Sequence, residues 1–258
     1  MSIEADNRYD TAATLGMVQA HWAAVQPDVP AIVSARGDRT FAELNANANR
    51  LVQAWRKRGV GEGDAVALMV SNRPEFAEVV AATQRSGLRI TPVNWHLTAD
   101  EAAYIVGDCQ ARVFVADARF AEVAAAAAEQ ATGATVRLAV GGDIAGFESY
   151  DAALAAHDGA DIDDPVLGGS MLYTSGTTGR PKGVMLSHDN ILSNVKACLG
   201  AYDVFNDDVF LSFLPMSHMF ERTGGYYLTM VAGATVAIAR SIPQLSEDFK
   251  SVRPTIIV

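Results

Sequence analysis

The sequence predicts an α/β fold built on mostly parallel sheets. Short apolar runs alternate with amphipathic stretches of roughly ten to fifteen residues, an order typical of strands and helices in parallel α/β proteins. The chain has 258 residues, of which 50% are hydrophobic and 19% charged. That length and composition allow one large domain or two lobes around a sizeable core.

The first half of the chain shows the alternation most clearly. Apolar residues of the stretch Phe41 to Arg58 recur on one helical face, namely Leu44, Ala48, Leu51, Val52 and Trp55. A glycine-rich stop at 59–63 separates this helix from an apolar strand at 64–70. Further helices are expected at 74–86, 99–108 and 121–131, and further strands at 88–93, 112–116 and 135–140.

The second half continues the pattern after an acidic, turn-rich segment, HDGADIDDP, which we interpret as a linker at 157–165. Strands are expected at 170–174, 184–186, 209–214, 235–239 and 255–258. Ser187 is a plausible N-cap for a helix at 189–199. The apolar strand at 255–258 has no cap or polar tail after it, so we expect the chain to be part of a longer protein.

Composition excludes several classes of function. The 30 acidic and 20 basic residues give a net charge of −10 and a pI near 4.9, which argues against nucleic acid as a partner. Cys109 and Cys198 are too few for a disulfide framework and fit a reducing compartment. The acidic N-terminus is unlike a signal peptide, and no apolar run could span a bilayer. We therefore expect a cytoplasmic protein that binds small molecules, with at most peripheral membrane contact.

One polar stretch, YTSGTTGRPKG at 173–183, has the ingredients of a phosphate-binding loop. A Walker loop needs Gly-Lys-Ser/Thr opening a helix, whereas Lys182 lies between Pro181 and Gly183 and a strand follows. Gly176 and Gly179 still let the backbone approach an anion closely. Hydroxyl donors are supplied by Thr174, Ser175, Thr177 and Thr178. The alternative is a flexible surface loop, which the apolar strands on both sides disfavour.

This stretch resembles the signature loop of the adenylate-forming enzymes, which include acyl-CoA synthetases, luciferase and the adenylation domains of peptide synthetases. Other matching motifs follow in the family's order, namely G59-VGEG-D64, S86-GLRITPVN-W95, L214-PMSHM-F220 and G233-AT-V236. The stretches 214–222 and 241–255 are most similar to long-chain fatty acyl-CoA synthetases. The resemblance implies the N-terminal portion of such an enzyme.

The implied fold has two stacked αβαβα subdomains with mostly parallel sheets. One subdomain would be contiguous from 64 to 201, and the other would combine 1–63 with 207–258 and remain incomplete. The implied reaction is ATP-dependent activation of a fatty acid to an acyl-adenylate and then to acyl-CoA. ATP, Mg²⁺ and CoA would be the cofactor and co-substrates.

The resemblance also implies which residues do this. Thr174, Ser175, Gly176, Thr177, Thr178, Gly179 and Lys182 would cradle the ATP phosphates, with Thr177 as a magnesium ligand. His218 and Lys182 would be catalytic, and the acyl group would lie beside His218, Phe220 and Gly224. For His218 alone, a packed core residue is the alternative. For Gly224 and Gly225, an ordinary packing role is the alternative.

Other polar residues are expected to be structural. The segment 187–190 is interpreted as a helix cap rather than a catalytic site, and Glu221 with Arg222 as a local ion pair on a solvated face. Trp95 and His96 are expected to pack near a cleft. A solvated helix face is expected at Glu247, Asp248 and Lys250.

Two alternatives to a fatty acyl-CoA synthetase stay open. One is an adenylating ligase for an aryl or amino acid; an amino-acid enzyme would need an Asp in the stretch 219–227, which has none, although Glu221 weakens this argument. The other is a non-catalytic remnant that binds nucleotide or acyl groups. Family members have a later Glu that holds magnesium, an Asp that binds ribose and a C-terminal domain with an essential lysine, and none of these has a counterpart here. An incomplete second subdomain could also favour a homo-oligomer.

We therefore predict that the 258-residue chain by itself does not form acyl-CoA. Loss of the cations that stabilise charge at the α-phosphate should lower turnover by several orders of magnitude. The assay is AMP and acyl-CoA formation from ATP, Mg²⁺, CoA and palmitate. Turnover at about one per second or faster would contradict the prediction.

Overall fold

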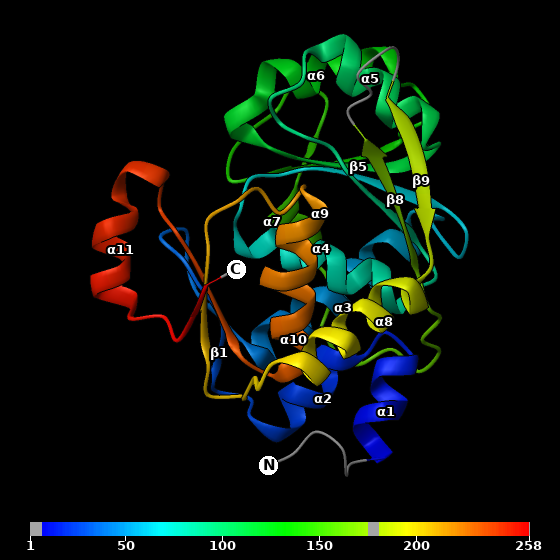
Figure 1. Ribbon diagram of the computed structural model, residues 1–258. Coiled ribbons are helices and arrows are strands. Elements are labelled where there is room, and N and C mark those ends of the chain that lie inside the picture. Colours follow the sequence, from blue (N-terminus) through cyan, green and yellow to red (C-terminus); the bar gives the residue numbers. More distant parts are fainter. Residues whose placement is uncertain (1–6, 175–180, 258) are drawn as a thin grey trace.

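A computed structural model describes residues 7–174 and 181–257, which form two β-sheets with helices between and outside them (Figure 1). The first sheet has the strand order β12-β10-β11-β1-β2, in which only the edge strand β2 runs antiparallel to its neighbour among the described residues. Its strands are β1 Pro30–Val33, β2 Arg39–Thr40, β10 Val209–Ser212, β11 Thr235–Ile238 and β12 Ile256–Ile257.

The second sheet has the strand order β7-β6-β5-β3-β4-β8-β9. Its pairs are parallel except for β8 and β9, which form an antiparallel hairpin at one edge. Its strands are β3 Ala65–Met69, β4 Arg89–Pro92, β5 Ala111–Asp117, β6 Val136–Val140, β7 Glu148–Ser149, β8 Gly169–Thr174 and β9 Lys182–Leu186.

Helices cover both faces of the second sheet. The α-helices are α1 Asn7–Thr14, α2 Val18–Val25, α3 Phe41–Lys57, α4 Pro74–Arg85, α5 Ala99–Asp108, α6 Ala121–Gln130, α7 Tyr150–Ala155, α8 His188–Ala201, α9 Met219–Glu221, α10 Leu228–Ala232 and α11 Leu245–Val252. Short 3₁₀ segments are η2 Ala118–Phe120 and η4 Ile242–Gln244, and η3 Arg222–Tyr227 is a π-helical segment between α9 and α10.

The core is divided by the second sheet. Alternate residues of β3 point to opposite faces, so Val66 and Leu68 join the cluster that contains α2, α3 and α4, while Ala67 and Met69 pack with α5 and α6. The first cluster also holds Ile32 and other apolar residues of the first sheet, so these helices form a layer between the two sheets. In Figure 1, α5 and α6 lie at the opposite end of the molecule from α1 and α2. All five residues of β3 are buried, as expected of a strand covered on both faces.

The structure confirms the α/β class with mostly parallel sheets, and each helix and strand predicted above has a counterpart within a few residues. Side-chain caps explain several helix starts: Thr40, Thr98 and Ser187 each form a capping box at the start of α3, α5 and α8. The sequence analysis did not include β1, β2, β7, α1, α2 or α7, several of which are very short. The subdomain boundaries at 64–201, and at 1–63 with 207–258, remain predictions.

The segment predicted as a linker, 157–165, is held against α3 by its own acidic side chains. The Asp161 carboxylate accepts hydrogen bonds from Asn45 (2.8 Å) and Asn49 (2.7 Å). The exposed Asp158 accepts one from the half-buried Gln53 (3.2 Å). The acidic run is therefore a docked strap rather than a free connection.

A buried guanidinium joins this strap to three helices. Arg85, the last residue of α4, has no exposed surface, and its Nη1 donates to the side-chain oxygens of Asn45 (2.7 Å) and Asn49 (2.6 Å) in α3. Its Nη2 donates to Gln19 of α2 (3.3 Å), and its Nε donates to the Ala81 carbonyl (3.2 Å). Burial lowers the pKa of Arg85 to about 10, which leaves it charged at neutral pH. The side-chain NH₂ groups of Asn45 and Asn49 in turn donate to the Asp161 carboxylate.

We predict that Arg85→Ala lowers the free energy of unfolding by about 3–5 kcal/mol, because it leaves buried amide oxygens without a donor and opens a cavity. Arg112, exposed on β5, provides the matched control, and Arg112→Ala should change stability by less than about 0.5 kcal/mol. Urea denaturation of the three proteins measures both values. Equal midpoints for Arg85→Ala and Arg112→Ala would show that the buried network is not a stabilising centre.

Candidate functional site

The β8–β9 hairpin carries the ends of the predicted phosphate loop. Thr174 and Lys182 are paired across the two strands, and Lys182 is exposed at the start of β9. The predicted loop residues Ser175, Gly176, Thr177, Thr178 and Gly179 lie outside the described residues, so the structure does not test their roles. The described flanks fix where the loop leaves and rejoins the sheet, at the edge beside β4.

Helix α5 holds the base of this hairpin. The Tyr104 hydroxyl donates to the Pro181 carbonyl (3.3 Å), and the Tyr173 hydroxyl donates to Asp108 Oδ2 (2.5 Å). Burial and this hydrogen bond raise the pKa of Tyr173 well above its ordinary value, so the phenol remains a donor. On the next strand, Gly183 leaves room for Met171, whose Cε would lie 2.1 Å from an added Cβ. The hairpin ends are thus anchored on both strands.

His218 lies on the loop that follows β10 and directly precedes α9. Its side chain is exposed, and its backbone N–H donates to the Pro215 carbonyl (2.8 Å). Phe220, two residues on, is 57% exposed. The structure therefore excludes a packed core position for His218 and places an imidazole and an aromatic ring together at the surface, after the carboxyl end of a parallel strand. Open α/β sheets bind ligands at such ends.

Glu221 and Arg222 do not form the solvated ion pair predicted from the sequence. Their exposed fractions are 1% and 0%, and the carboxylate oxygens of Glu221 and the Nε and Nη1 of Arg222 have no hydrogen-bond partner among the described residues. Burial raises the pKa of Glu221. Burial lowers the pKa of Arg222. The prediction failed because tertiary packing buries both residues, which the local sequence does not show, and because adjacent residues on a helix point in different directions.

The glycines that follow have different positions. Gly225 is buried, and an added Cβ would lie 2.4 Å from Glu221 Oε1, so a larger residue here would displace the Glu221 carboxylate. Gly224, predicted to contact the acyl group, is partly buried within the π-helical segment η3. Short π-helical segments are frequent at functional sites, because they change the direction of side chains within a helix.

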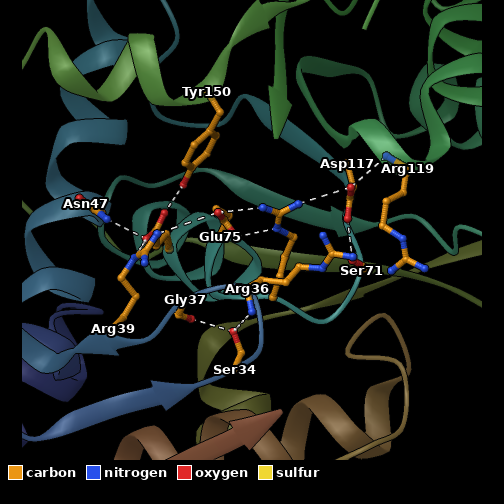
Figure 2. A network of polar contacts seen from close by, with 12 residues as sticks. Ser34, Arg36, Gly37, Arg39, Asn47, Ser71, Glu75, Asp117, Arg119 and Tyr150 are labelled. Carbon is orange, nitrogen blue, oxygen red and sulfur yellow. Dashed lines mark hydrogen bonds and ion pairs between the residues drawn. The ribbon is translucent and has the colours of Figure 1, made fainter. Parts of the chain in front are cut away.

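A network of charged side chains connects the two sheets near these loops (Figure 2). Ser71, just after β3, donates to Asp117 Oδ2 at the end of β5 (2.6 Å). Arg73 donates to both oxygens of Glu75 (2.7 and 3.1 Å), and its Nη1 lies 3.4 Å from Asp117 Oδ1. Burial lowers the pKa of Arg73, but the hydrogen bond and charge of Glu75, with those of Asp117, outweigh burial and raise it overall.

Arg39 of β2 connects this network to the first sheet, because its Nη2 lies 3.9 Å from Glu75 Oε1 and its Nε pairs with the buried carboxylate of Glu78. Glu78 of α4 accepts hydrogen bonds from Arg39 of β2 (2.7 Å), Asn47 of α3 (2.8 Å) and Tyr150 of α7 (2.6 Å). The sequence analysis missed this network and the neighbouring Asn72. The run S71-N-R73 directly after a buried strand was the available signal, because polar residues gather at the carboxyl ends of parallel strands.

Other sequence predictions have mixed outcomes. The Ser187 cap is confirmed, and the buried His188 beside it contacts the Ala13 carbonyl of α1 (3.3 Å). The Trp95 ring stacks on Phe120, with centroids 6.0 Å apart. The solvated face predicted in α11 is wrong for Asp248, which is 3% exposed and accepts hydrogen bonds from the backbone N–H and Nε of Arg240.

The two predicted parts of the site belong to different sheets. Lys182 belongs to the second sheet and His218 follows a strand of the first, and no hydrogen bond joins the two among residues 7–174 and 181–257. The described residues contain no group of three His, Cys, Asp or Glu side chains able to hold a metal ion. None of the helices in this part of the chain has the length and hydropathy needed to cross a bilayer.

Comparison with known proteins gives a consistent family match. The family model described as AMP-binding enzyme matches residues 19–258. Long-chain-fatty-acid–CoA ligase FadD13 of Mycobacterium tuberculosis is 31% identical over 238 residues, which cover 89% of this chain and 45% of that protein. Indoleacetate–CoA ligase of Aromatoleum aromaticum is 30% identical over 220 residues, covering 84% and 43%. The chain thus spans about half the length of these curated relatives.

Solved structures show the same fold. The inhibitor-bound N-terminal domain of FACL13 from Mycobacterium tuberculosis superposes with a TM-score of 0.83 at 26% identity, covering 95% of this chain and 62% of that chain. A putative long-chain-fatty-acid CoA ligase from Rhodopseudomonas palustris gives a TM-score of 0.82 at 27% identity, with the same coverage of both chains.

We predict that Glu221→Gln raises the thermal midpoint at pH 7–8 but not at pH 4. The pKa of Glu221 is raised in the folded protein, so the group favours folding below the ordinary carboxyl value of 4.5, and this contribution is lost as pH rises through the folded pKa. Glutamine does not titrate and avoids the loss. Glu129→Gln, at an exposed position of α6, is the control. A shift in midpoint of equal size at both pH values would contradict the prediction.

Proposed function

Because the chain belongs to the AMP-binding enzyme family, as the match over residues 19–258 shows, we propose that it is the ATP- and acid-binding portion of a fatty acyl-CoA ligase. The observation that carries the proposal is the sequence TSGTTGRPKG at the paired strands β8 and β9, together with a separate surface loop that presents His218. The proposal is that the hairpin binds the ATP phosphates and the His218 loop binds the acid.

In the proposed reaction, a carboxylate oxygen of the acid attacks the α-phosphate of ATP. The bond to the β-phosphate breaks, which yields acyl-adenylate and pyrophosphate. The thiolate of CoA then attacks the acyl carbon, and AMP leaves. Because phosphoryl transfer depends on positioning and charge stabilisation, Lys182 and the backbone N–H groups of the loop would hold the β- and γ-phosphates. Thr177 would ligate Mg²⁺, the cation that neutralises phosphate charge in such sites.

The acid side of the proposed site uses the loop after β10. The exposed imidazole of His218 can donate a hydrogen bond to a carboxylate or to the acyl carbonyl. The half-exposed ring of Phe220 offers an apolar surface next to it, and Gly224 lies within the π-helical segment along which an acyl chain would run. An acyl chain that covers Phe220 gains free energy from the apolar area removed from water.

A fatty acid is the favoured substrate class. Support comes from the relatives named as long-chain-fatty-acid ligases and from the resemblance of the stretches 214–222 and 241–255 to long-chain synthetases. The runner-up is an aryl acid, because relatives of similar identity are named indoleacetate–CoA ligase and feruloyl-CoA synthase. A homo-oligomer, a cytoplasmic location and peripheral membrane contact remain predictions from the sequence.

We predict that Lys182→Ala weakens ATP binding ten- to a hundred-fold, because one charge-assisted contact to phosphate is lost. Lys196→Ala, at an exposed position of α8, removes the same charge outside the proposed site and should leave the affinity unchanged. Titration calorimetry with ATP and Mg²⁺ measures both variants. Unchanged affinity in Lys182→Ala would refute the phosphate assignment, and equal loss in both variants would indicate a general charge effect.

We predict that affinity for fatty acids in the presence of ATP rises with chain length from octanoate to palmitate. Each buried methylene contributes up to about 0.8 kcal/mol. Indoleacetate and ferulate are the comparison ligands, since proteins named for them are relatives of this chain. Calorimetry ranks the acids under one set of conditions. If ferulate or indoleacetate bound more tightly than palmitate, the aryl-acid alternative would replace the fatty-acid proposal.

A further inference from the structure

The loop that carries His218 is fixed by one side chain from the other sheet. Asn72 follows β3, and its Nδ2 donates to the Leu214 carbonyl (2.6 Å). Its Oδ1 accepts from the backbone N–H of Met216 (2.8 Å). A single side-chain amide thus bonds one backbone acceptor and one backbone donor of the loop, two residues apart. We call these two hydrogen bonds, from Asn72 to Leu214 and Met216, the clamp.

The orientation of this amide is determined by its partners. A backbone carbonyl can only accept and a backbone N–H can only donate, so the nitrogen of Asn72 has to face Leu214 and its oxygen Met216. Aspartate has no donor when ionised, and a serine hydroxyl is too short to reach both groups. Asparagine therefore supplies a contact that few other residue types could supply at this position.

Buried contacts hold both ends of the clamp. On one side, Ser71 and Arg73 are each 5% exposed and are tied to Asp117 by a hydrogen bond and an ion pair (Figure 2). On the other side, Met216 is 1% exposed and packs in the core between the sheets. Asn72 itself is only half-buried. The clamp thus connects the buried residues that follow β3 with the buried Met216 of the loop after β10.

The clamp acts on His218 through a short path. The His218 N–H donates to the Pro215 carbonyl (2.8 Å), which lies between the two clamped residues, and the His218 carbonyl accepts from Arg222 N–H (3.0 Å) in the helix that follows. His218 is therefore held by a turn whose preceding residues are fixed to the second sheet. That sheet also carries the β8–β9 hairpin with Lys182.

We propose that Asn72 is a positioning residue that fixes the loop 214–218, and with it His218, relative to the phosphate-binding hairpin. The assignment of a substrate role to this loop rests on the proposed function, whereas the clamp itself rests on the geometry. Asn72 touches neither substrate nor reacting atoms in this account. It sets the distance between the two parts of the site, which come from different sheets.

The first test measures whether the clamp protects the backbone of the loop when no ligand is bound. Backbone amide exchange at Met216 and His218 is measured by NMR in the wild type, Asn72→Ala, Asn72→Asp and the control Asn206→Ala, whose side chain contacts Gln26 at the surface. We expect Met216 exchange to be at least ten-fold faster in Asn72→Ala and unchanged in Asn206→Ala. In Asn72→Asp the ionised carboxylate still accepts from Met216 N–H but cannot donate to the Leu214 carbonyl, so Met216 should lose only part of its protection. Acidification should restore that part, because the protonated carboxyl can donate.

Two results of this first test would overturn the proposal. One is wild-type protection of Met216 in Asn72→Ala. The other is a loss of protection spread over β3, α4 and β10 together with a large drop in thermal midpoint, which would make Asn72 a general stabilising residue. The pH-dependent recovery of Asn72→Asp separates these roles, since a purely structural defect would not be repaired by one proton.

The second test measures whether loss of the clamp weakens ligand binding at the proposed site. Calorimetry compares binding of ATP alone with binding of a non-hydrolysable acyl-adenylate analogue that reaches both parts. Asn72→Ala should bind the analogue about ten-fold more weakly, about 1.4 kcal/mol, while its affinity for ATP remains that of the wild type. Wild-type affinity of Asn72→Ala for both ligands would overturn the positioning role. If the wild type bound neither ligand, the proposed function would fail, and the exchange data alone would decide the clamp.

Discussion

The buried guanidinium of Arg85 is the contact on which the helical layer between the sheets depends. A charge without exposed surface is tolerated only when its hydrogen bonds are made, and Arg85 finds acceptors in α2, α3 and α4. Through Asn45 and Asn49 the same contact holds Asp161 of the acidic strap. Helices α2, α3 and α4, which pack between the two sheets, are therefore fixed to one another. The loops at the carboxyl ends of β3 and β10 meet next to this helical layer.

This arrangement explains how a site can be assembled from distant segments. The hairpin that presents Lys182 belongs to the second sheet, while the loop with His218 follows a strand of the first. No hydrogen bond or ion pair joins the two elements among the described residues, so their separation has to be set by the framework. The charged network of Arg73, Glu75 and Asp117 and the amide of Asn72 supply that framework at the edge where the strands end. Geometry of this kind favours a ligand that reaches across both loops.

Sequence patterns were sufficient for much of the fold. Buried parallel strands are apolar throughout, helices are amphipathic, and Ser187 marks a helix start, so β3, α5 and α8 could be placed within a residue or two. The two-residue strands β2 and β7 have too few side chains to form a periodic pattern. Their pairing depends on neighbours that are remote in the sequence.

The candidate site was predicted less completely, for a physical reason. Loop motifs identify residues that can bind phosphate, but burial is decided by tertiary packing. Glu221 and Arg222 resemble a surface pair in the sequence and are both buried in the structure. Asn72 carries no chemical signal by itself, because an asparagine after a strand is common in turns. Its role emerges only when Leu214 and Met216, more than a hundred residues away, are seen at its two ends.

The central claim is that one ligand binds the β8–β9 hairpin and the His218 loop together. A crystal structure of this chain with a non-hydrolysable acyl-adenylate analogue tests it most directly. We predict that the adenylate lies between the two loops, with its acyl group within contact distance of His218 and Phe220 and its phosphate-equivalent group facing the hairpin that begins β9 with Lys182. A ligand that contacts only one of the two loops, or binds elsewhere on the molecule, would contradict the account.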